Sequence, residues 1–599
     1  MEIGKLTEIE MLSDNTMQYL YKNSNGEHNE LYFELKKRAN ALKITNIFNK
    51  QYKEFKKKLA KGKLEKENFC DFEEGKYEDI CTGSWVANVN GIFKQVPNHE
   101  TGEIDKVEAS RMQVVPTELL YNIDTKEEKV KLSFYKYDKW NSIVCEKTTV
   151  SIAHKIVELS KTGIDITSSN AKNMVDYFYD CLTLNDDPDI KFYKSLSRMG
   201  WVENRFMPFC DDIKFDGDNN NKYMYQNLTP KGDKEKWIKY VGDLRKKSEF
   251  LRLQMAVSFV SPILEPLNLL PFIFHMYGKS GTGKTVGMII SMSVWGNSIM
   301  GKLTKSLNNT ANAVMDTCAF MRNVPVALDE LQAIKSKVGY DKFVMMICEG
   351  VERGRMKFDQ SKETRTWKNA FLFSGEEPLV GDNSGGGVFN RVIEIDVTGK
   401  EVIDASIGDK IVEFISQNHG LIAKEYIEYI IRDLEEIKAK YEQIKNNVKK
   451  LASDSTNKQI MALSCIVLGD YLARKYFFKN EENLDNELLK NLMFTDNEVD
   501  VTERGYEYIK DTISMNMNKF TKESNEIWGA IKEEAIYIQK TKLNELLKNA
   551  GFEFKSMQKS WSDKNYIKRD SQGRYYHNTK CHGIKSNYIV FNKDFDDLE

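Results

Sequence analysis

The stretch PFIFHMYGKSGTGKTVGMII, residues 271–290, decides the fold of this 599-residue chain. An apolar strand pattern runs into GKSGTGKT, which matches the phosphate-loop pattern GxxxxGK[ST], and an apolar helix pattern follows. Successive backbone N–H groups of such a loop point at phosphate oxygens, and glycines stand where a Cβ would block that approach. Lys284 supplies a charge for the β- and γ-phosphates, and the Thr285 hydroxyl is a ligand for Mg²⁺. The sequence therefore predicts an ATP and Mg²⁺ site at Gly278, Lys279, Ser280, Gly281, Thr282, Gly283, Lys284 and Thr285.

A second apolar strand pattern, NVPVALDEL at residues 323–331, ends in two carboxylates. Sheets of the α/β class place their ligands at the carboxyl ends of strands. We expect Asp329 to hold Mg²⁺ through water, beside Thr285, and Glu330 to orient and activate the attacking water. The alternative is a surface Asp-Glu pair of the kind that can follow any strand. The position of Asp329, 44 residues after Thr285, favours the catalytic interpretation.

Two further strand patterns, NAFLFSGEEP and RVIEIDV, complete a series of alternating strands and helices typical of a parallel sheet. An acidic strand followed by a polar-tipped strand resembles the AAA+ ATPases. In that family the polar tip, sensor 1, positions the hydrolytic water, and Ser374 matches it. Arg391 follows the glycine-rich turn GDNSGGGVFN and resembles the arginine finger that reaches the γ-phosphate of a neighbouring subunit. A charge at the edge of a strand is the alternative for Arg391.

The rest of the chain is predicted to form separate domains around this core. SWVANVNGIFKQV predicts a hairpin with a turn at Asn90 and Gly91, and residues 427–451 predict a long amphipathic helix. The basic run at residues 50–63 is interpreted as a solvated helical face, and the polar stretch at 211–237 as an interdomain linker. The predicted domains are a helical segment (1–75), an α+β domain that contacts DNA or a partner (76–215), the ATPase core (216–400), a helical lid (401–500) and a winged helix (505–599).

The phosphate loop, the acidic strand and the sequence between them resemble the MCM-like AAA+ helicases of phages and mobile genetic elements. These include the helicases of staphylococcal cassette chromosome elements. CEGVERGRMKFDQSKETRTWKNAFLF matches the hairpin that projects into the pore of these rings, and FNRVIEID matches their arginine-finger segment at Arg391. STNKQIMALSCIVLGDYLAR resembles the sensor 2 helix, with Lys458 where the family usually has Arg. The hairpin residues implied to contact DNA are Arg353, Arg355, Lys357, Lys362 and Arg365, with Trp367 at the base; a solvated surface hairpin is the alternative.

The C-terminal segment predicts a winged helix. TKLNELLKNAGF and KSMQKSWSDKNYIKR read as two helices, and RDSQGRYY and NYIVF as two strands around a turn at residues 571–573. Residues 541–590 contain 10 Lys/Arg and 4 Asp/Glu, a net charge of +6. A winged helix that binds protein is the alternative to one that binds DNA. The predicted phosphate contacts are Lys559, Lys564, Lys568, Arg569 and Arg574.

Composition limits the class of protein. The chain has 87 Lys+Arg against 89 Asp+Glu, a net charge of −2, which argues against a uniformly basic nucleic-acid binder. Nine scattered cysteines without a CxxC pair favour free thiols in a reducing cytoplasm, and His577, Cys581 and His582 lack the second cysteine pair of a zinc site. No apolar run is long enough for a membrane span and no secretory signal is visible, so a cytoplasmic location is expected.

The predicted fold is of the α/β class: an AAA+ phosphate-loop ATPase core with a helical lid, an N-terminal α+β domain and a C-terminal winged helix. The resemblance implies an ATP-dependent DNA helicase that forms a hexameric ring, moves 3′→5′ on one strand and acts in replication of a mobile element. The sequence contains no recognisable primase signature, so a separate primase or polymerase is expected as a partner. Two other functions stay open. One is an AAA+ loader or remodelling ATPase, and the other is a nucleotide-gated DNA-binding switch without unwinding.

Overall fold

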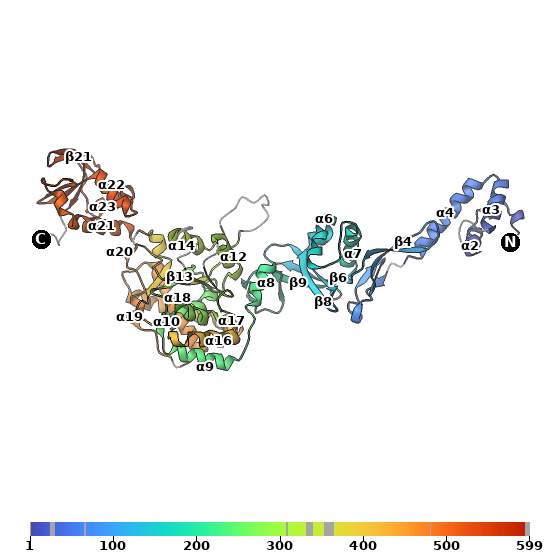
Figure 1. Ribbon diagram of the computed structural model, residues 1–599, viewed down its shortest axis with the longest axis horizontal. Helices are drawn as coiled ribbons and strands as arrows, with labels where there is room; N and C mark the ends of the chain where they lie inside the picture. Colours follow the sequence, from blue (N-terminus) through green and yellow to red (C-terminus); the bar gives the residue numbers. More distant parts are fainter. Residues whose placement is uncertain are drawn as a thin grey trace. The chain divides into compact units, whose positions relative to one another are not determined.

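The computed structural model describes residues 2–23, 30–64, 67–306, 310–330, 339–352, 364–381, 383–479 and 481–592 (Figure 1). The chain divides into two compact units. Unit 1 comprises Met1–Ser197 and Asp211–Asp216, and unit 2 comprises Arg198–Cys210 and Gly217–Glu599. Among the described helices, none combines the length and the apolar character that crossing a bilayer requires.

Unit 1 begins with a helical module built around one apolar core. Met17 and Leu20 of α2, Leu35 of α3 and Phe48 of α4 are fully buried in this core. Apolar residues three or four positions apart lie on one side of a helix, so each helix turns one face inward and leaves its charged face exposed. The helices are η1 (Ile3–Lys5), α1 (Glu8–Met11), α2 (Asp14–Asn23), α3 (Glu30–Ala41) and α4 (Thr45–Gly62).

The first β-elements of unit 1 contain the predicted hairpin. Asn88 pairs with Gly91, so Val89 and Asn90 form the turn, one residue earlier than predicted. A third strand extends this hairpin into a sheet of order β3-β4-β5. The elements are β1 (Asn68–Phe69), η2 (Glu73–Gly75), β2 (Cys81–Gly83), β3 (Trp85–Asn88), β4 (Gly91–Pro97) and β5 (Ile104–Ser110).

A five-stranded sheet of order β12-β9-β6-β7-β8 forms the rest of unit 1. Val130, Leu132 and Phe134 alternate along β7 and are buried beside Tyr177 and Phe178 of α7. The elements are β6 (Val114–Asn122), β7 (Glu128–Tyr135), β8 (Trp140–Glu146), α5 (Lys147–Ser151), α6 (Ala153–Ile156), η3 (Val157–Thr162), α7 (Ala171–Leu184) and β9 (Lys191–Leu196).

The stretch predicted as an interdomain linker, 211–237, contains the boundary between the two units at Asp216 and Gly217, but it is not an irregular linker, since it includes β12 (Ile213–Phe215) and α8 (Asn219–Gln226). Its polar residues are used inside the fold. The buried Asp216 carboxylate accepts hydrogen bonds from Ser195 Oγ at 2.8 Å and from Ser197 Oγ at 2.7 Å. A buried carboxylate requires such hydrogen-bond partners. The polar residue Asp216 is therefore part of a hydrogen-bonded interior site and is not exposed to water.

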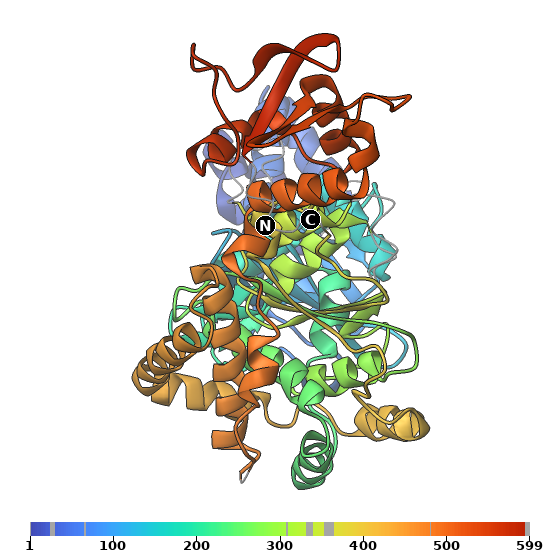
Figure 2. The ribbon, with the colours of Figure 1, turned by 90° about the vertical axis from the view of Figure 1, so that its left-hand side faces the viewer.

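The centre of unit 2 is a parallel sheet of order β14-β15-β16-β13-β17. Every residue of β13 from Phe272 to Met276 is fully buried, because helices cover both faces of the sheet (Figure 2). The strands are β13 (Phe272–Tyr277), β14 (Thr304–Ser306), β15 (Val326–Asp329), β16 (Ala370–Gly375) and β17 (Val392–Asp396), and a separate hairpin pairs β10 (Gly200–Val202) with β11 (Arg205–Met207). The helices of this region are α9 (Lys234–Arg245), α10 (Glu249–Val260), η4 (Ser261–Ile263), α11 (Lys284–Met292), α12 (Ala311–Met321), α14 (Tyr340–Cys348) and α15 (Gly386–Phe389).

Helices that follow the sheet form the lid region. The predicted amphipathic helix is present as α17, and its apolar seam, which includes Ile430, Ile437 and Ile444, is buried. α17 packs on α18, and α18 packs on α10. The elements are η5 (Ala405–Ile407), α16 (Gly408–Gln417), α17 (Ala423–Leu451), α18 (Asn457–Tyr476), α19 (Asn486–Lys490) and α20 (Asp496–Val499).

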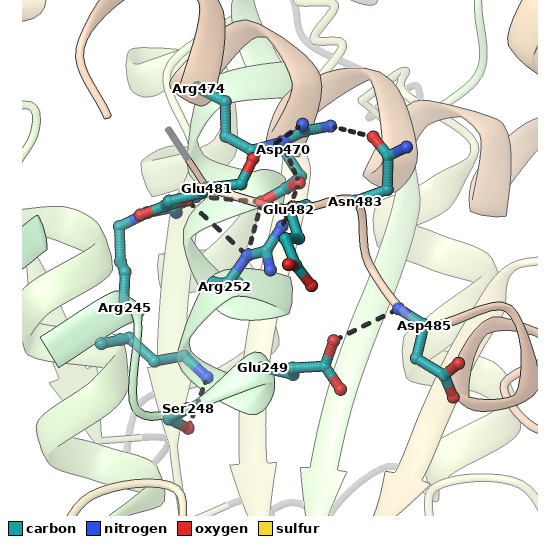
Figure 3. Close-up of polar contacts among 11 residues, drawn as sticks. Arg245, Ser248, Glu249, Arg252, Asp470, Arg474, Glu481, Glu482, Asn483 and Asp485 are labelled. Carbon is teal, nitrogen blue, oxygen red and sulfur yellow. Dashed lines mark hydrogen bonds and ion pairs between the residues drawn. The ribbon is translucent and has the colours of Figure 1, made fainter. Parts of the chain in front are cut away.

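A buried ion cluster joins α18 to α9 and α10 (Figure 3). Asp470 of α18 accepts from Arg245 Nη2 at 2.9 Å, from Arg252 Nη2 at 2.8 Å and from Arg474 Nε at 2.9 Å. Glu481 lies 2.8 Å from Arg245 Nη2. Removal of one partner from such a buried cluster costs about 3–5 kcal/mol, because an uncompensated charge stays behind. The cluster therefore fixes the lid helix against the helices that precede the sheet.

The C-terminal part of unit 2 has its own apolar core around Trp561, Leu543 and Phe591. The turn predicted at 571–573 does not join two strands. Asp570 Oδ1 accepts backbone N–H groups of Gln572 and Arg574, which closes a turn inside a loop, and the two strands meet at His582 and Gly583 instead. The elements are α21 (Val501–Met515), η6 (Met517–Phe520), β18 (Gly529–Lys532), β19 (Ala535–Gln539), α22 (Lys540–Asn549), α23 (Phe554–Asp563), β20 (His577–Cys581) and β21 (Ile584–Asn592).

Candidate active site

The predicted phosphate loop lies between β13 and α11 and closes around its own lysine. Lys284 Nζ donates to the Gly278 carbonyl at 2.8 Å and to the Lys279 carbonyl at 2.9 Å. Burial lowers the pKa of Lys284, while the charges of Asp329 and Glu376 act in the opposite direction. The Lys284 ammonium group is thus held at the centre of the loop, where it would interact with phosphate oxygens.

Glycine is required at two positions of the loop. Gly278 and Gly283 have φ of 135° and 82°, in the region that residues with a Cβ rarely adopt. A Cβ on Gly283 would lie 2.4 Å from the Ile403 carbonyl oxygen, and one on Gly278 would lie 2.9 Å from the Thr398 nitrogen. The loop therefore packs against the segment that follows β17 and keeps its other side open.

Asp329, at the end of β15, connects three neighbouring elements. Its Oδ2 accepts a hydrogen bond from Thr285 Oγ1 at 2.8 Å. Its Oδ1 accepts from the Ser374 hydroxyl at the end of β16 and from the Glu330 backbone N–H at 3.0 Å. The parallel register brings the predicted site residues Thr285, Asp329 and Ser374 together. Ser374 is fully buried behind Asp329, so its hydroxyl orients the carboxylate and does not face the cavity.

Glu330 turns out of the strand with φ of 58°, a left-handed conformation that is uncommon for a residue with a Cβ. Its Oε2 accepts from Ser306 Oγ, at the end of β14, at 3.0 Å. Glu330 and Asp329 both line the same cavity. The strained backbone aims the second carboxylate of the pair away from the sheet and into the cavity.

The cavity beside the loop has a volume of about 390 Å³. It contains the loop residues from Ser280 to Thr285, and also residues that sequence reasoning did not identify. These come from three places: Val286 of α11, the end of β16 with the residue that follows it, and the segment after β17 that includes η5 and the first half of α16. Since β17 is the immediate neighbour of β13, the chain leaving β17 passes beside the phosphate loop. The lining residues that sequence reasoning missed are Val286, Gly375, Glu376, Ile403, Asp404, Ala405, Gly408, Asp409 and Val412.

The oxygen atoms in the cavity suit Mg²⁺. Thr285 offers a hydroxyl and Asp329 a carboxylate, which are hard oxygen ligands. Within the described parts of the chain, no group of three or more His, Cys, Asp or Glu could hold a metal alone. Mg²⁺ usually takes one or two protein ligands and completes its shell with water and substrate phosphates, so the donors fit that ion only together with a nucleotide.

The buried His275 and the partly buried Glu394 hold the loop after β16. His275 Nε2 is hydrogen-bonded to the Glu377 carbonyl at 3.0 Å, and burial lowers the pKa of His275 to about 4. Glu394 of β17 accepts the Leu379 and Val380 N–H groups at 2.9 and 3.4 Å. Burial outweighs these hydrogen bonds and raises the pKa of Glu394 to about 7. The loop that carries Glu376 into the cavity is thus fixed from two strands.

Arg391 lies at the opposite end of the sheet from the cavity. Its carbonyl accepts from the Ile273 N–H at the start of β13, whereas the phosphate loop begins after Tyr277 at the end of the same strand. Four residues at about 3.3 Å each separate the two ends by roughly 13 Å. The Arg391 guanidinium donates to the Gly387 carbonyl at 2.8 Å.

The first turn of α18 holds the backbone on both sides of Arg391. The buried Gln459 amide donates to the Val392 carbonyl at 2.9 Å and also to the Phe389 carbonyl. The Thr456 hydroxyl donates to the Asn390 side chain. Lys458, the predicted sensor 2, is exposed and does not line the cavity within the described chain. Sequence reasoning selected the charged neighbour and missed Gln459, since a buried amide has no sequence signature.

The predicted DNA contacts are placed unevenly. Arg353, Arg355, Lys357 and Lys362 lie outside the described residues. On either side of that stretch in the sequence, Val351 bridges Thr366 antiparallel, and Trp367 is buried with its indole N–H donated to the Ile347 carbonyl at 2.7 Å. Arg365 is paired with Glu352 at 2.8 Å and Asp316 at 2.6 Å.

In the C-terminal domain, two of the predicted DNA contacts are used in ion pairs. Lys564 lies 3.0 Å from Asp500 and also contacts Glu503, and Arg569 lies 3.1 Å from Asp563. The other three predicted contacts, Lys559, Lys568 and Arg574, have no acidic partner within ion-pair distance among the described residues. Their charges are thus not matched by ion pairs within the described part of the domain.

Comparisons with known proteins agree with this architecture. Residues 85–368 match a family described as a domain of unknown function (DUF927), and residues 500–596 match the Cch helix turn helix domain. A solved structure described as "SCCmec type IV Cch - active helicase" superposes with a TM-score of 0.65 at 17% identity, over 86% of this chain and 98% of that chain. No curated protein matches this chain. The chain therefore has a mixed α/β fold that is similar to that of a helicase and ends in a helix-turn-helix domain.

Proposed function

We propose that this protein is an ATP-dependent DNA helicase of a mobile genetic element, built on an AAA+ core. The observation that carries the proposal is the contact of Asp329 with both Thr285 and Ser374 beside a complete phosphate loop. Strand β16, which ends near Ser374, lies between the phosphate-loop strand β13 and the acidic strand β15, so the three motifs meet at one edge of the sheet. The similarity to a Cch helicase and the helix-turn-helix match support DNA as the substrate of the motor.

The chemistry follows from the side chains in the cavity. Backbone N–H groups of the loop and Lys284 would bind the β- and γ-phosphates of ATP. Thr285 and Asp329 would hold Mg²⁺, which, when bound, neutralises charge that develops on the transferred phosphoryl group. Ser374 keeps the Asp329 carboxylate turned toward Thr285. Glu330 would accept the proton of the attacking water.

The position of Arg391 supports a ring. This side chain is roughly 13 Å of strand away from its own phosphate loop, which fits an arginine that completes the cavity of a neighbouring subunit. Placed there, it would spread the transition-state charge. We propose a hexamer that moves 3′→5′ on one strand and works with a separate primase or polymerase. The pore hairpin, the winged helix and Lys568 are the proposed DNA contacts.

The proposal is tested by the unwinding of a forked duplex. Wild type should unwind with ATP, and Glu330→Gln should lose hydrolysis by about two orders of magnitude or more while it still binds nucleotide. Glu377→Gln is the matched control, since Glu377 follows the cavity residue Glu376 but does not line the cavity. ATP hydrolysis without unwinding and without stimulation by DNA would instead indicate a loader. DNA binding that depends on nucleotide but survives Glu330→Gln would indicate a switch.

A further inference from the structure

Helix α4 of the N-terminal module carries a mainly basic surface, the lysine face, on its exposed side, with Glu54 as the one acid of the helix. The opposite side packs into the module core through Phe48, Tyr52 and Ala60, all buried. Helical periodicity therefore sends the intervening residues to solvent. The lysine face consists of Lys50, Lys53, Lys57, Lys58 and Lys61, which are all exposed.

The charges of the lysine face are not matched by acids. Residues 30–64 contain eleven Lys/Arg and three Asp/Glu. Two other lysines of the helix region are used inside the unit: Lys63 pairs with Glu103 at 2.6 Å, and the buried Lys56 donates to the Glu100 carbonyl. Within the described chain, the five lysines of the face have no acidic partner at ion-pair distance. This contrasts with α17, where Lys438 and Lys445 pair with Glu435 and Glu442.

The spacing of the lysine face suits a run of phosphates. At 100° per residue, Lys50, Lys57 and Lys61 lie within about 40° of one another, away from the buried side, and the exposed Glu54 lies beside this row. At 1.5 Å per residue they span roughly 17 Å along a straight axis. A duplex carries one negative charge per about 1.7 Å of its axis, so several phosphates face a helix of this length. Three lysines in one row can therefore contact phosphates at the same time.

We propose that the lysine face of α4 binds the phosphate backbone of duplex DNA, without sequence preference, as a contact separate from the motor and the C-terminal domain. Single strands are held mainly by stacking on exposed aromatic side chains, and the aromatic residues of α4 turn inward. A membrane surface would need the apolar side of the helix, which is already buried in the module core. The proposal does not depend on ATP hydrolysis.

The test is binding of a labelled duplex of arbitrary sequence to the full chain without nucleotide, measured by fluorescence anisotropy over a salt series. The test variant carries Lys50→Gln, Lys57→Gln and Lys61→Gln together. Each phosphate contact contributes about 0.9 to the slope of log affinity against log salt, so the slope should fall by about 3 and the affinity by about tenfold or more at moderate salt. Gln keeps the helix propensity of these exposed positions, and circular dichroism checks the fold.

Two matched variants isolate the lysine face. The same three positions changed to Arg should keep the wild-type slope, because the charges remain. Lys438→Gln, Lys445→Gln and Lys449→Gln on α17 remove equal charge elsewhere and should leave the slope unchanged. An unchanged slope in the α4 Gln variant overturns the proposal, as would equal loss on single-stranded DNA or on anionic vesicles. Hydrolysis of ATP without DNA should stay at wild-type level, so loss of helicase function in Glu330→Gln is a separate result.

Discussion

The two ends of the central sheet of unit 2 are built differently. At the carboxyl end, Thr285, Asp329 and Ser374 hold one another through side-chain hydrogen bonds contributed by neighbouring strands and the phosphate loop. At the amino end, Arg391 is bonded to a backbone carbonyl of its own loop, and Gln459 of a lid helix holds the backbone beside it. All the side chains that hold the carboxyl end come from the sheet and its phosphate loop. The amino end depends on the lid and, in the proposed ring, on a neighbouring subunit.

The largest effect on ATP hydrolysis is expected from Arg391, at the amino end of the sheet. Arg391→Ala should lower kcat for ATP hydrolysis by about 10³–10⁵-fold, the range for loss of an arginine finger, and leave nucleotide binding nearly unchanged. Binding should persist because Arg391 does not line the cavity of its own chain. Steady-state hydrolysis and titration with a fluorescent nucleotide measure the two quantities. Arg391→Lys tests the geometry, since a lysine keeps the charge without the planar fork.

Rings that combine two variants test whether Arg391 acts on the cavity of a neighbouring subunit. Arg391→Ala subunits keep Glu330, and Glu330→Gln subunits keep Arg391. Combined rings should therefore recover part of the hydrolysis that each variant lacks alone. No recovery, with mixed rings demonstrated by affinity capture, would contradict an action of Arg391 in a neighbouring subunit.

A smaller effect is expected from Ser374 at the carboxyl end. Ser374→Ala removes the donor to Asp329 Oδ1 but leaves Thr285 bonded to Oδ2. We expect kcat to fall by about 10–100-fold and the apparent affinity for Mg²⁺ to weaken, because the carboxylate loses one of its two side-chain partners. Hydrolysis measured over a Mg²⁺ series checks this. A loss that is independent of Mg²⁺ would indicate that Ser374 acts on the attacking water instead.

What could be predicted from the sequence depended on how far apart the contributing residues lie along the chain. The predicted phosphate loop is contiguous, so a local pattern was enough to select Lys284 and Thr285, and both line the cavity. Asp329 was identified because a carboxylate at the end of a buried strand has a local signature. Asp404 and Asp409 have none: they line the cavity only because β17 pairs beside β13 and its exit passes the loop.

Polarity misled the sequence interpretation in two places. Residues 211–237 looked like a linker, yet the polar Asp216 is buried with hydroxyl partners. The serine- and glycine-containing turn at 571–573 looked like a hairpin end, yet Asp570 closes it inside a loop. In both cases the outcome depended on hydrogen bonds to partners whose positions are set only by the folded chain.

A moderate effect is expected from Gln459, on the lid side of the comparison. Gln459→Leu leaves the Val392 carbonyl without its side-chain donor, which should cost about 1–3 kcal/mol of stability. Because the backbone beside Arg391 is then less constrained, hydrolysis should fall several-fold while nucleotide affinity is kept. Thermal unfolding and kcat measure these effects. Lys458→Gln is the control on the same turn, and a larger loss in Lys458→Gln than in Gln459→Leu would favour the predicted sensor 2 over the positioning role.

The smallest effect concerns Glu394, which lies between the two ends on β17. Burial raises the pKa of Glu394 from 4.5 to about 7, so between these pH values the folded chain keeps a proton that the unfolded chain releases. The free energy of unfolding should therefore fall as pH rises through this window, by at most about 1.4 kcal/mol per pH unit, and show no further change from this group above it. Glu394→Gln should remove that slope and keep an acceptor for the Leu379 N–H. The difference in Tm between wild type and variant, followed from pH 5 to pH 8, isolates Glu394 because the opposite contribution of His275 is common to both proteins. If the difference in Tm does not change with pH, the Glu394 carboxylate is ionised over the whole range. The loop after β16 is then held by a charged carboxylate and not by a protonated one.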